Sequence, residues 1–132
     1  MKERIKKWLG KQPDFSSRDY WENRYRSGGN SGDGSYGRLA EFKAAFLNSF
    51  IAEYQIQHAI EFGCGDGHQL SLIKYPKYLG VDVSESIIKH CAEKFRGDQT
   101  KSFIQYNTHT FFNNRFIHAD LTLSLDVIYH IV

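Results

Sequence analysis

Several kinds of residue that define common protein classes are scarce in this sequence. The 132 residues include two cysteines, Cys64 and Cys91, and two prolines, which excludes a disulfide framework and a proline-rich architecture. No stretch approaches the roughly 20 apolar residues needed to cross a bilayer, and the basic N-terminus lacks the apolar core of a secretory signal. We therefore expect a cytoplasmic chain without a membrane span.

Histidine and positive charge are present but do not gather into a recognisable site. The six histidines are scattered and form neither an HExxH nor a CxxC unit, so we expect no metal site. The formal net charge is only +2, which is too small to indicate nucleic-acid binding. Positive residues are densest at 1–11. They belong to a helical segment over about 1–25, which suits a surface helix, a lid over a ligand or a weak contact with an anionic membrane.

The first 55 residues predict a helical cap. Apolar spacing favours helices over 1–25, interrupted near Pro13, and over 38–53, while the glycine-rich run at 26–37 predicts a loop. The helix over 38–53 carries an apolar stripe, which we expect to face the core. The stripe consists of Leu39, Phe42, Ala45, Phe46, Ser49 and Phe50.

From residue 56 onward, short apolar runs alternate with helical patterns. The strands are expected at 58–62, 78–83, 102–106 and 120–125, and the helices at 67–74 and 85–95, the latter capped by Ser84. This alternation predicts an α/β, Rossmann-like fold, a doubly wound parallel sheet with helices on both faces. We expect one structural domain, with the cap and loop over 1–55 and the core over 56–132.

The most informative motif lies at the end of the first strand. Glu61 is followed by the turn Gly63-Cys64-Gly65-Asp66-Gly67, and Asp82 stands at the end of the second strand. Glycines allow a sharp turn and a close approach of backbone to a ligand. A carboxylate at the end of the next strand can accept both hydroxyls of a ribose. The pair therefore predicts a ligand that contains a nucleoside.

The spacing of the glycines narrows the choice of nucleoside. A dinucleotide site prefers GxGxxG, but His68 occupies the place of the third glycine, and no lysine follows to make a phosphate-binding loop. The acids Glu61 and Asp66 suit a cationic ligand better than a phosphate. S-adenosylmethionine, with its sulfonium, ammonium and ribose, fits these charges, and an NAD or nucleotide-sugar module remains the alternative.

The motifs EFGCGDG and GVDVS resemble motifs I and II of class I S-adenosylmethionine-dependent methyltransferases, and LTLSLDVIYHIV resembles their motif IV region. The segment before the core is similar to the cap of many small bacterial members. The resemblance implies that the backbone of Gly63, Cys64 and Gly65 meets the methionine and ribose. It assigns Glu61 to the glycine loop and the cofactor amino group, and Asp82 to the ribose.

The resemblance also implies roles further along the chain. Val83 would pack on the adenine, Asn107 would stand where the family reads the adenine amino group, and Asp126 would lie near the methionine or the acceptor. Asp66, within the glycine turn, joins this set of cofactor-binding candidates. His130 is the candidate catalytic base, because imidazole titrates near neutrality.

The chain departs from the family in length, because the family fold has seven strands and this sequence supplies four, lacking the last ones. The fourth strand would be an open edge, so we expect a homo-oligomer, a partner that covers the edge, or a C-terminally truncated product of a longer gene. The expected activity is methyl transfer to a small-molecule or glycan-type acceptor. The alternative is a non-catalytic fragment or subunit that binds S-adenosylmethionine or S-adenosylhomocysteine.

Overall fold

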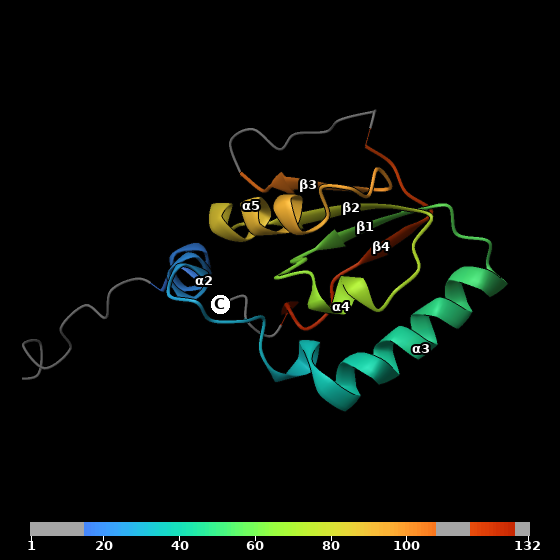
Figure 1. Ribbon diagram of the computed structural model, residues 1–132, viewed down its shortest axis with the longest axis horizontal. Helices are drawn as coiled ribbons and strands as arrows, with labels where there is room; N and C mark the ends of the chain where they lie inside the picture. The colour runs from blue at the N-terminus through green and yellow to red at the C-terminus, as the bar shows by residue number, and fades with distance from the viewer. Residues whose placement is uncertain (1–14, 108–116, 129–132) are drawn as a thin grey trace, which may run out of the picture.

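The structure is a computed structural model that describes residues 15–107 and 117–128. Its centre is a parallel sheet of four strands in the order β3-β2-β1-β4 (Figure 1). The strands are β1 (His58–Phe62), β2 (Lys77–Asp82), β3 (Lys101–Gln105) and β4 (Leu121–Leu123). All four expected strands are present, and the predicted α/β class with a parallel sheet is confirmed.

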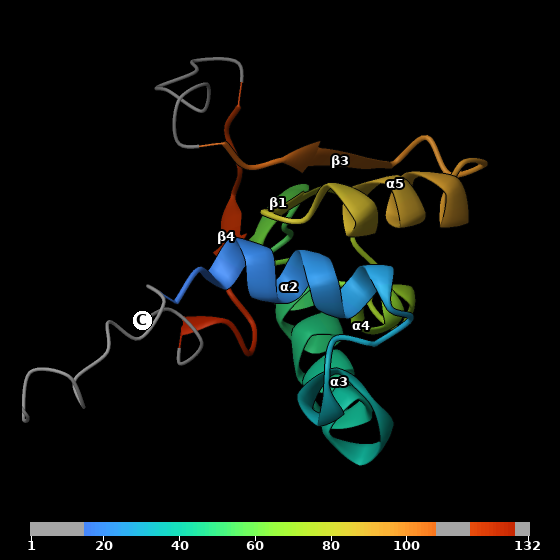
Figure 2. The same cartoon turned by 90° about the vertical axis from the view of Figure 1, so that its left-hand side faces the viewer.

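In the described part of the chain, three helical segments precede β1, and two helices connect β1 to β2 and β2 to β3. These segments are α2 (Ser17–Arg26), the single turn η1 (Asp33–Ser35), α3 (Gly37–Glu53), α4 (His68–Ser71) and α5 (Glu85–Lys94). Residues of α3 and α4 share one apolar core with β1 and β2, and Figure 2 shows α3, α4 and α5 on the same side of the sheet. The start of the first expected helix and most of the connection from β3 to β4 lie outside the described residues.

The order of the strands creates a switch point beside β1. From β1 the chain moves outward through β2 to β3, and then returns to place β4 on the other side of β1. Ligands of doubly wound sheets bind beyond the carboxyl ends of the strands at such a reversal. The glycine turn follows β1 directly, so the fold places it at this point.

Hydrogen bonds from polar side chains mark the start of α5 and the end of α4, the two helices after β1. Ser84 caps α5 as predicted, because its side chain accepts a hydrogen bond from the amide of Ile87 at 3.2 Å. Helix α4 is shorter than the expected span of 67–74. The side chain of Asn48 ends it by donating to the carbonyl of Leu72 at 3.1 Å and accepting from the amide of Lys74 at 2.7 Å.

The prediction for the inner face of α3 is wrong. Its buried residues are Ala40, Ala44, Leu47 and Ile51, whereas Leu39, Phe42 and Phe46 of the expected stripe are exposed. Both stripes have helical spacing, so periodicity alone could not choose between them. Two of the buried positions are alanines, and Gln69 of α4 donates a hydrogen bond to the carbonyl of one of them, Ala40, at 3.0 Å.

Strand β4 has two unlike faces. Leu121, Leu123 and Leu125 pack against the apolar core, while Thr122 and Ser124 are exposed. Among the described strands, β4 pairs with β1 only. One edge of β4 is therefore without a strand partner in the part of the chain that the structure describes. Within the same residues, no helix is long and apolar enough to cross a membrane.

Candidate nucleoside-binding site

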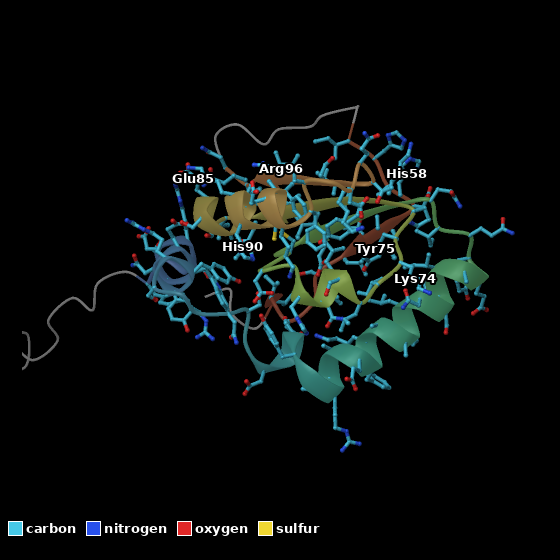
Figure 3. All side chains as sticks on the ribbon, in the orientation of Figure 1. His58, Lys74, Tyr75, Glu85, His90 and Arg96 are labelled. Atoms are coloured by element: carbon cyan, nitrogen blue, oxygen red, sulfur yellow. The ribbon has the colours of Figure 1, made fainter. Side chains whose placement is uncertain are left out.

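A cavity of about 460 Å³ opens at the carboxyl ends of the strands. Its walls come from the turns after β1 and β2, from the chain after β3 and β4, and from one side of α2. Figure 3 labels Glu85 at the start of α5 and His58 at the start of β1, and the cavity lies at the Glu85 end of the sheet. The cavity therefore lies where the switch point of the sheet predicts a ligand.

The glycine turn is held tightly to the end of β2. The amides of Gly63 and Cys64 both donate to the carbonyl of Val81, at 2.7 and 3.1 Å. Gly63 has a φ of 78°, and a Cβ there would lie 2.3 Å from the side chain of Val127. Because both amides are already engaged, the turn offers a ligand close approach rather than free backbone donors.

Asp82 is joined directly to this turn. Its Oδ2 accepts a hydrogen bond from the amide of Gly65 at 3.1 Å, and its Oδ1 accepts one from the amide of Ser84 at 3.0 Å. The side chain lines the cavity and is almost fully buried. Burial raises its pKa above the usual value, and the two amides act against that shift. Each carboxylate oxygen retains a further lone pair for a ligand hydroxyl.

Glu61 lies deeper in the same cavity and is 3% exposed. The phenol of Tyr78 donates to its Oε2 at 2.6 Å. Burial raises the pKa of Glu61 to about 7, although the Tyr78 hydrogen bond and the nearby Lys43 favour the carboxylate. With Asp82 and Asp126, the described wall contains three carboxyl groups and no basic side chain, which suits a cation better than a phosphate.

The structure does not bring Asp66 to the cavity wall. Its Oδ2 accepts hydrogen bonds from the amide of Ser31 at 2.9 Å and from the phenol of Tyr36 at 2.7 Å, and its Oδ1 accepts one from the amide of His68. Burial would raise the pKa of Asp66, but these hydrogen bonds outweigh burial and lower it. The carboxylate thus fastens the 26–37 loop to the glycine turn.

Asp126 lines the cavity after β4 and is held from two sides. Its carboxylate forms an ion pair with Lys43 of α3, and a Cβ on Gly34 would lie 2.7 Å from its Oδ2. The residue has a φ of 56°, in the left-handed region that favours glycine. The surrounding contacts therefore hold a strained backbone at the edge of the cavity.

Three candidates from the sequence remain, Val83, Asn107 and His130. Val83 lines the cavity. Asn107 is exposed and lies outside the lining residues, whereas its neighbour Tyr106 is in the wall. His130 lies outside the described residues, so its role stays a prediction.

Sequence reasoning missed part of the wall. The missed residues are Trp21 of α2 and Gln69 of α4, which both line the cavity. Tyr25 of α2 is also in the wall, and it is one of the cap residues, with Tyr20, Tyr36 and Arg38, that the sequence suggests for a pocket. Gln69 is 5% exposed, its Nε2 donates to the carbonyl of Ala40 at 3.0 Å, and its Oε1 has no hydrogen-bond partner. The signal that could have identified Gln69 as a site residue is a glutamine on the inner side of so short a helix. The spacing of Trp21 and Tyr25 predicts a shared helix face, but not what that face covers.

A glycine turn bonded to a strand-end carboxylate, at the switch point of a parallel sheet, is typical of nucleoside-binding α/β proteins. The family described as methyltransferase domain matches residues 60–132. The chain belongs to this family, and the resemblance to class I S-adenosylmethionine-dependent methyltransferases is confirmed. A search of curated protein sequences finds none that matches this chain.

Solved methyltransferase structures share the fold. Magnesium protoporphyrin IX methyltransferase from Synechocystis PCC 6803, with bound S-adenosylhomocysteine, is 18% identical with a TM-score of 0.55, covering 83% of this chain and 57% of that chain. A methyltransferase from Podospora anserina, also bound to S-adenosylhomocysteine, is 15% identical with a TM-score of 0.54, covering 92% and 56%. The amino pentose methyltransferase CalS10 from Micromonospora echinaspora, bound to S-adenosylmethionine, is 17% identical with a TM-score of 0.53, covering 88% and 44%. The chain therefore spans about half the length of these proteins.

Proposed function

We propose that this chain binds S-adenosylmethionine and forms the cofactor-binding part of a methyltransferase. The observation that carries the proposal is the hydrogen bond between Gly65 and Asp82, which joins the glycine turn to the strand-end carboxylate inside the cavity. This arrangement suits a ribose held between the two turns. Family membership over residues 60–132 supports the same ligand.

The residues present fit the charged end of this cofactor. Gln69 Oε1 is a buried acceptor without a partner, and a buried acceptor of this kind is costly unless a ligand donor satisfies it. Together with Glu61 it would hold the ammonium group. Asp82 would hold the ribose hydroxyls, with Val83 and Tyr106 against the adenine. When bound, the cofactor supplies an electrophilic methyl group on its sulfonium.

The proposed reaction is transfer of that methyl group to a small-molecule or glycan-type acceptor. The solved relatives named for magnesium protoporphyrin IX and for an amino pentose are in keeping with a small acceptor. The chain's own residues would align the donor with the acceptor, and His130 would take a proton from the acceptor. A homo-oligomer or a partner chain at the open edge of β4 remains part of the proposal. Sedimentation velocity over a range of concentrations tests it, and a monomer throughout would count against it.

Calorimetric titration tests the cofactor assignment. The wild-type chain is titrated with S-adenosylhomocysteine, S-adenosylmethionine and NAD, and we expect saturable binding of the two sulfur ligands only. Asp82→Asn should weaken this binding at least tenfold, because the amide can no longer accept from two hydroxyls while serving Gly65 and Ser84. Glu93→Gln, an exposed carboxylate paired with Arg96 on the surface, is the control and should bind as wild type. Tight NAD binding without binding of either sulfur ligand would overturn the proposal.

A further inference from the structure

Helix α2 forms one wall of the cavity with very little apolar burial of its own. Ser17, Trp21 and Tyr25 recur every four residues and line the cavity, yet no residue of α2 is buried. Figures 1 and 2 show the helix alongside α5, at the end of the sheet where the cavity opens. Trp21 and Tyr25 are half-buried, and polar contacts add to their packing in holding α2 in this position.

The principal contacts come from Glu22. Its Oε2 accepts hydrogen bonds from the hydroxyl of Ser84 at 2.7 Å and from the amide of Ser86 at 3.2 Å, and its Oε1 accepts one from the Ser86 hydroxyl. These donors belong to the first turn of α5, where unpaired amides favour a negative charge. The hydrogen bonds from Ser86 and then Ser84 lower the pKa of Glu22 to about 2. The carboxylate is therefore charged at neutral pH.

Ser84 links this contact to the cofactor-binding turn. Its hydroxyl donates to Glu22 and accepts from the amide of Ile87, while its own amide donates to Asp82. Ser84 is fully buried. A displacement of Glu22 would therefore disturb the hydrogen bonds of Asp82, the carboxylate proposed to hold the ribose.

The far end of α2 is tied to the other turn of the site. The hydroxyls of Tyr25 and Ser31 lie 3.1 Å apart within hydrogen-bond distance, and the amide of Asp66 donates to Ser31 Oγ at 2.8 Å. The helix is thus fastened near its middle to the turn after β2, and at its end to the turn after β1. Trp21, next to the first tie, and Tyr25, which makes the second, both line the cavity.

We infer that Glu22 is a positioning residue, which holds the Trp21–Tyr25 face of α2 against the bound nucleoside cofactor. This inference rests on the proposed function for the identity of the ligand. The position of α2 is independent of the proposed function, because it can be measured without ligand. Loss of the Glu22 carboxylate should let α2 move away and weaken cofactor binding through faster dissociation.

The experiment reads the position of α2 from the fluorescence of Trp21. Trp8, the other of the two tryptophans, is replaced by Phe so that Trp21 is the single emitter. Acrylamide quenching is then measured for this background, Glu22→Ala, Glu22→Gln and Ser86→Ala, each with calorimetric titration of S-adenosylhomocysteine. The matched control is Glu85→Gln, a carboxylate in the same turn of α5 whose ion pair is with Lys89 of its own helix. Circular dichroism establishes that each variant is folded.

We expect Glu22→Ala to raise the quenching constant of Trp21 at least twofold and to weaken S-adenosylhomocysteine binding about tenfold, the scale of losing hydrogen bonds to a charged group. Ser86→Ala should shift both quantities in the same direction by less, and Glu85→Gln should shift neither. Unchanged quenching in folded Glu22→Ala would overturn the positioning role. Increased quenching with unchanged affinity would show that this face does not contact the ligand. If the background itself binds no S-adenosylhomocysteine, the proposed function fails, and the quenching series alone decides the role of Glu22.

Discussion

The phenol of Tyr78 on β2 donates a hydrogen bond of 2.6 Å to the carboxyl group of Glu61 on the neighbouring strand β1. Both side chains are at most 3% exposed. Burial disfavours the charged form of Glu61, and the hydrogen bond favours it, with the balance at a pKa of about 7. The folded protein therefore carries in the wall of the cavity a carboxyl group whose pKa lies near neutral pH.

This raised pKa predicts that stability falls as pH rises. Between the ordinary pKa of 4.5 and about 7, the folded state holds the Glu61 proton that the unfolded state has released. The wild-type chain should thus lose up to about 3 kcal/mol of unfolding free energy across this range. Glu61→Gln removes the titration, so its stability relative to wild type should rise from about pH 4.5 and level off above about pH 7. Urea unfolding at several pH values measures the difference.

The variant Tyr78→Phe tests the same Glu61–Tyr78 pair by removing the hydrogen-bond donor instead of the carboxyl group. Without the phenol, burial of Glu61 is no longer offset by that hydrogen bond, so the pKa of Glu61 should rise further. The loss of stability should then extend to higher pH than in the wild type. A stability difference between Glu61→Gln and wild type that does not change with pH would contradict the raised pKa.

Gly65 should tolerate no side chain. Its φ is 59°, and a Cβ would lie 2.3 Å from Ser31 Oγ, on the loop that Asp66 fastens to the turn. We expect Gly65→Ala to destabilise the protein by about 2 kcal/mol or more through backbone strain and this clash, and to abolish calorimetric binding of S-adenosylhomocysteine. Gly97→Ala is the matched control, because nothing lies within 4 Å of its Cβ position. Equal stability and equal affinity in the two variants would contradict the claim that the turn has no room for a side chain at Gly65.

The two apolar stripes of α3 should respond differently to truncation. Leu47 is 6% exposed and belongs to the core, whereas Phe42 is 71% exposed. Leu47→Ala should cost about 2–4 kcal/mol of unfolding free energy, and Phe42→Ala about 0.5 kcal/mol or less. Chemical denaturation measures both. A larger loss at Phe42 than at Leu47 would show that the exposed stripe is packed in solution.

His130 should matter for turnover and not for binding. As the predicted proton acceptor, it acts on the methyl acceptor rather than on the cofactor. Once an acceptor is found, His130→Ala should lower the rate at least a hundredfold, while the dissociation constant of S-adenosylhomocysteine stays within twofold of wild type. His90→Ala, on the exposed side of α5, is the control. Full turnover in His130→Ala would remove this residue from the mechanism.

Much of the architecture could be predicted because its signals are local. The four strands and the cap at Ser84 follow from short apolar runs and from a single serine before a helical pattern. The inner face of α3 could not be predicted, since both of its stripes have helical spacing and only burial in the shared core separates them. The same limit applies to Asp66, whose sequence neighbours suit a ligand but whose partners, Ser31 and Tyr36, lie 30 or more residues away.

By itself, the sequence determined that a glycine turn and a carboxylate end two successive strands, and parallel pairing of β1 with β2 then brings Gly65 and Asp82 together. Only the tertiary structure decided what closes the cavity over them. Trp21, Glu22 and Gln69 reach the site or its supports through contacts between distant segments. Their positions depend on how helices pack at the sheet, and a periodic pattern along one helix does not record the surface it will meet.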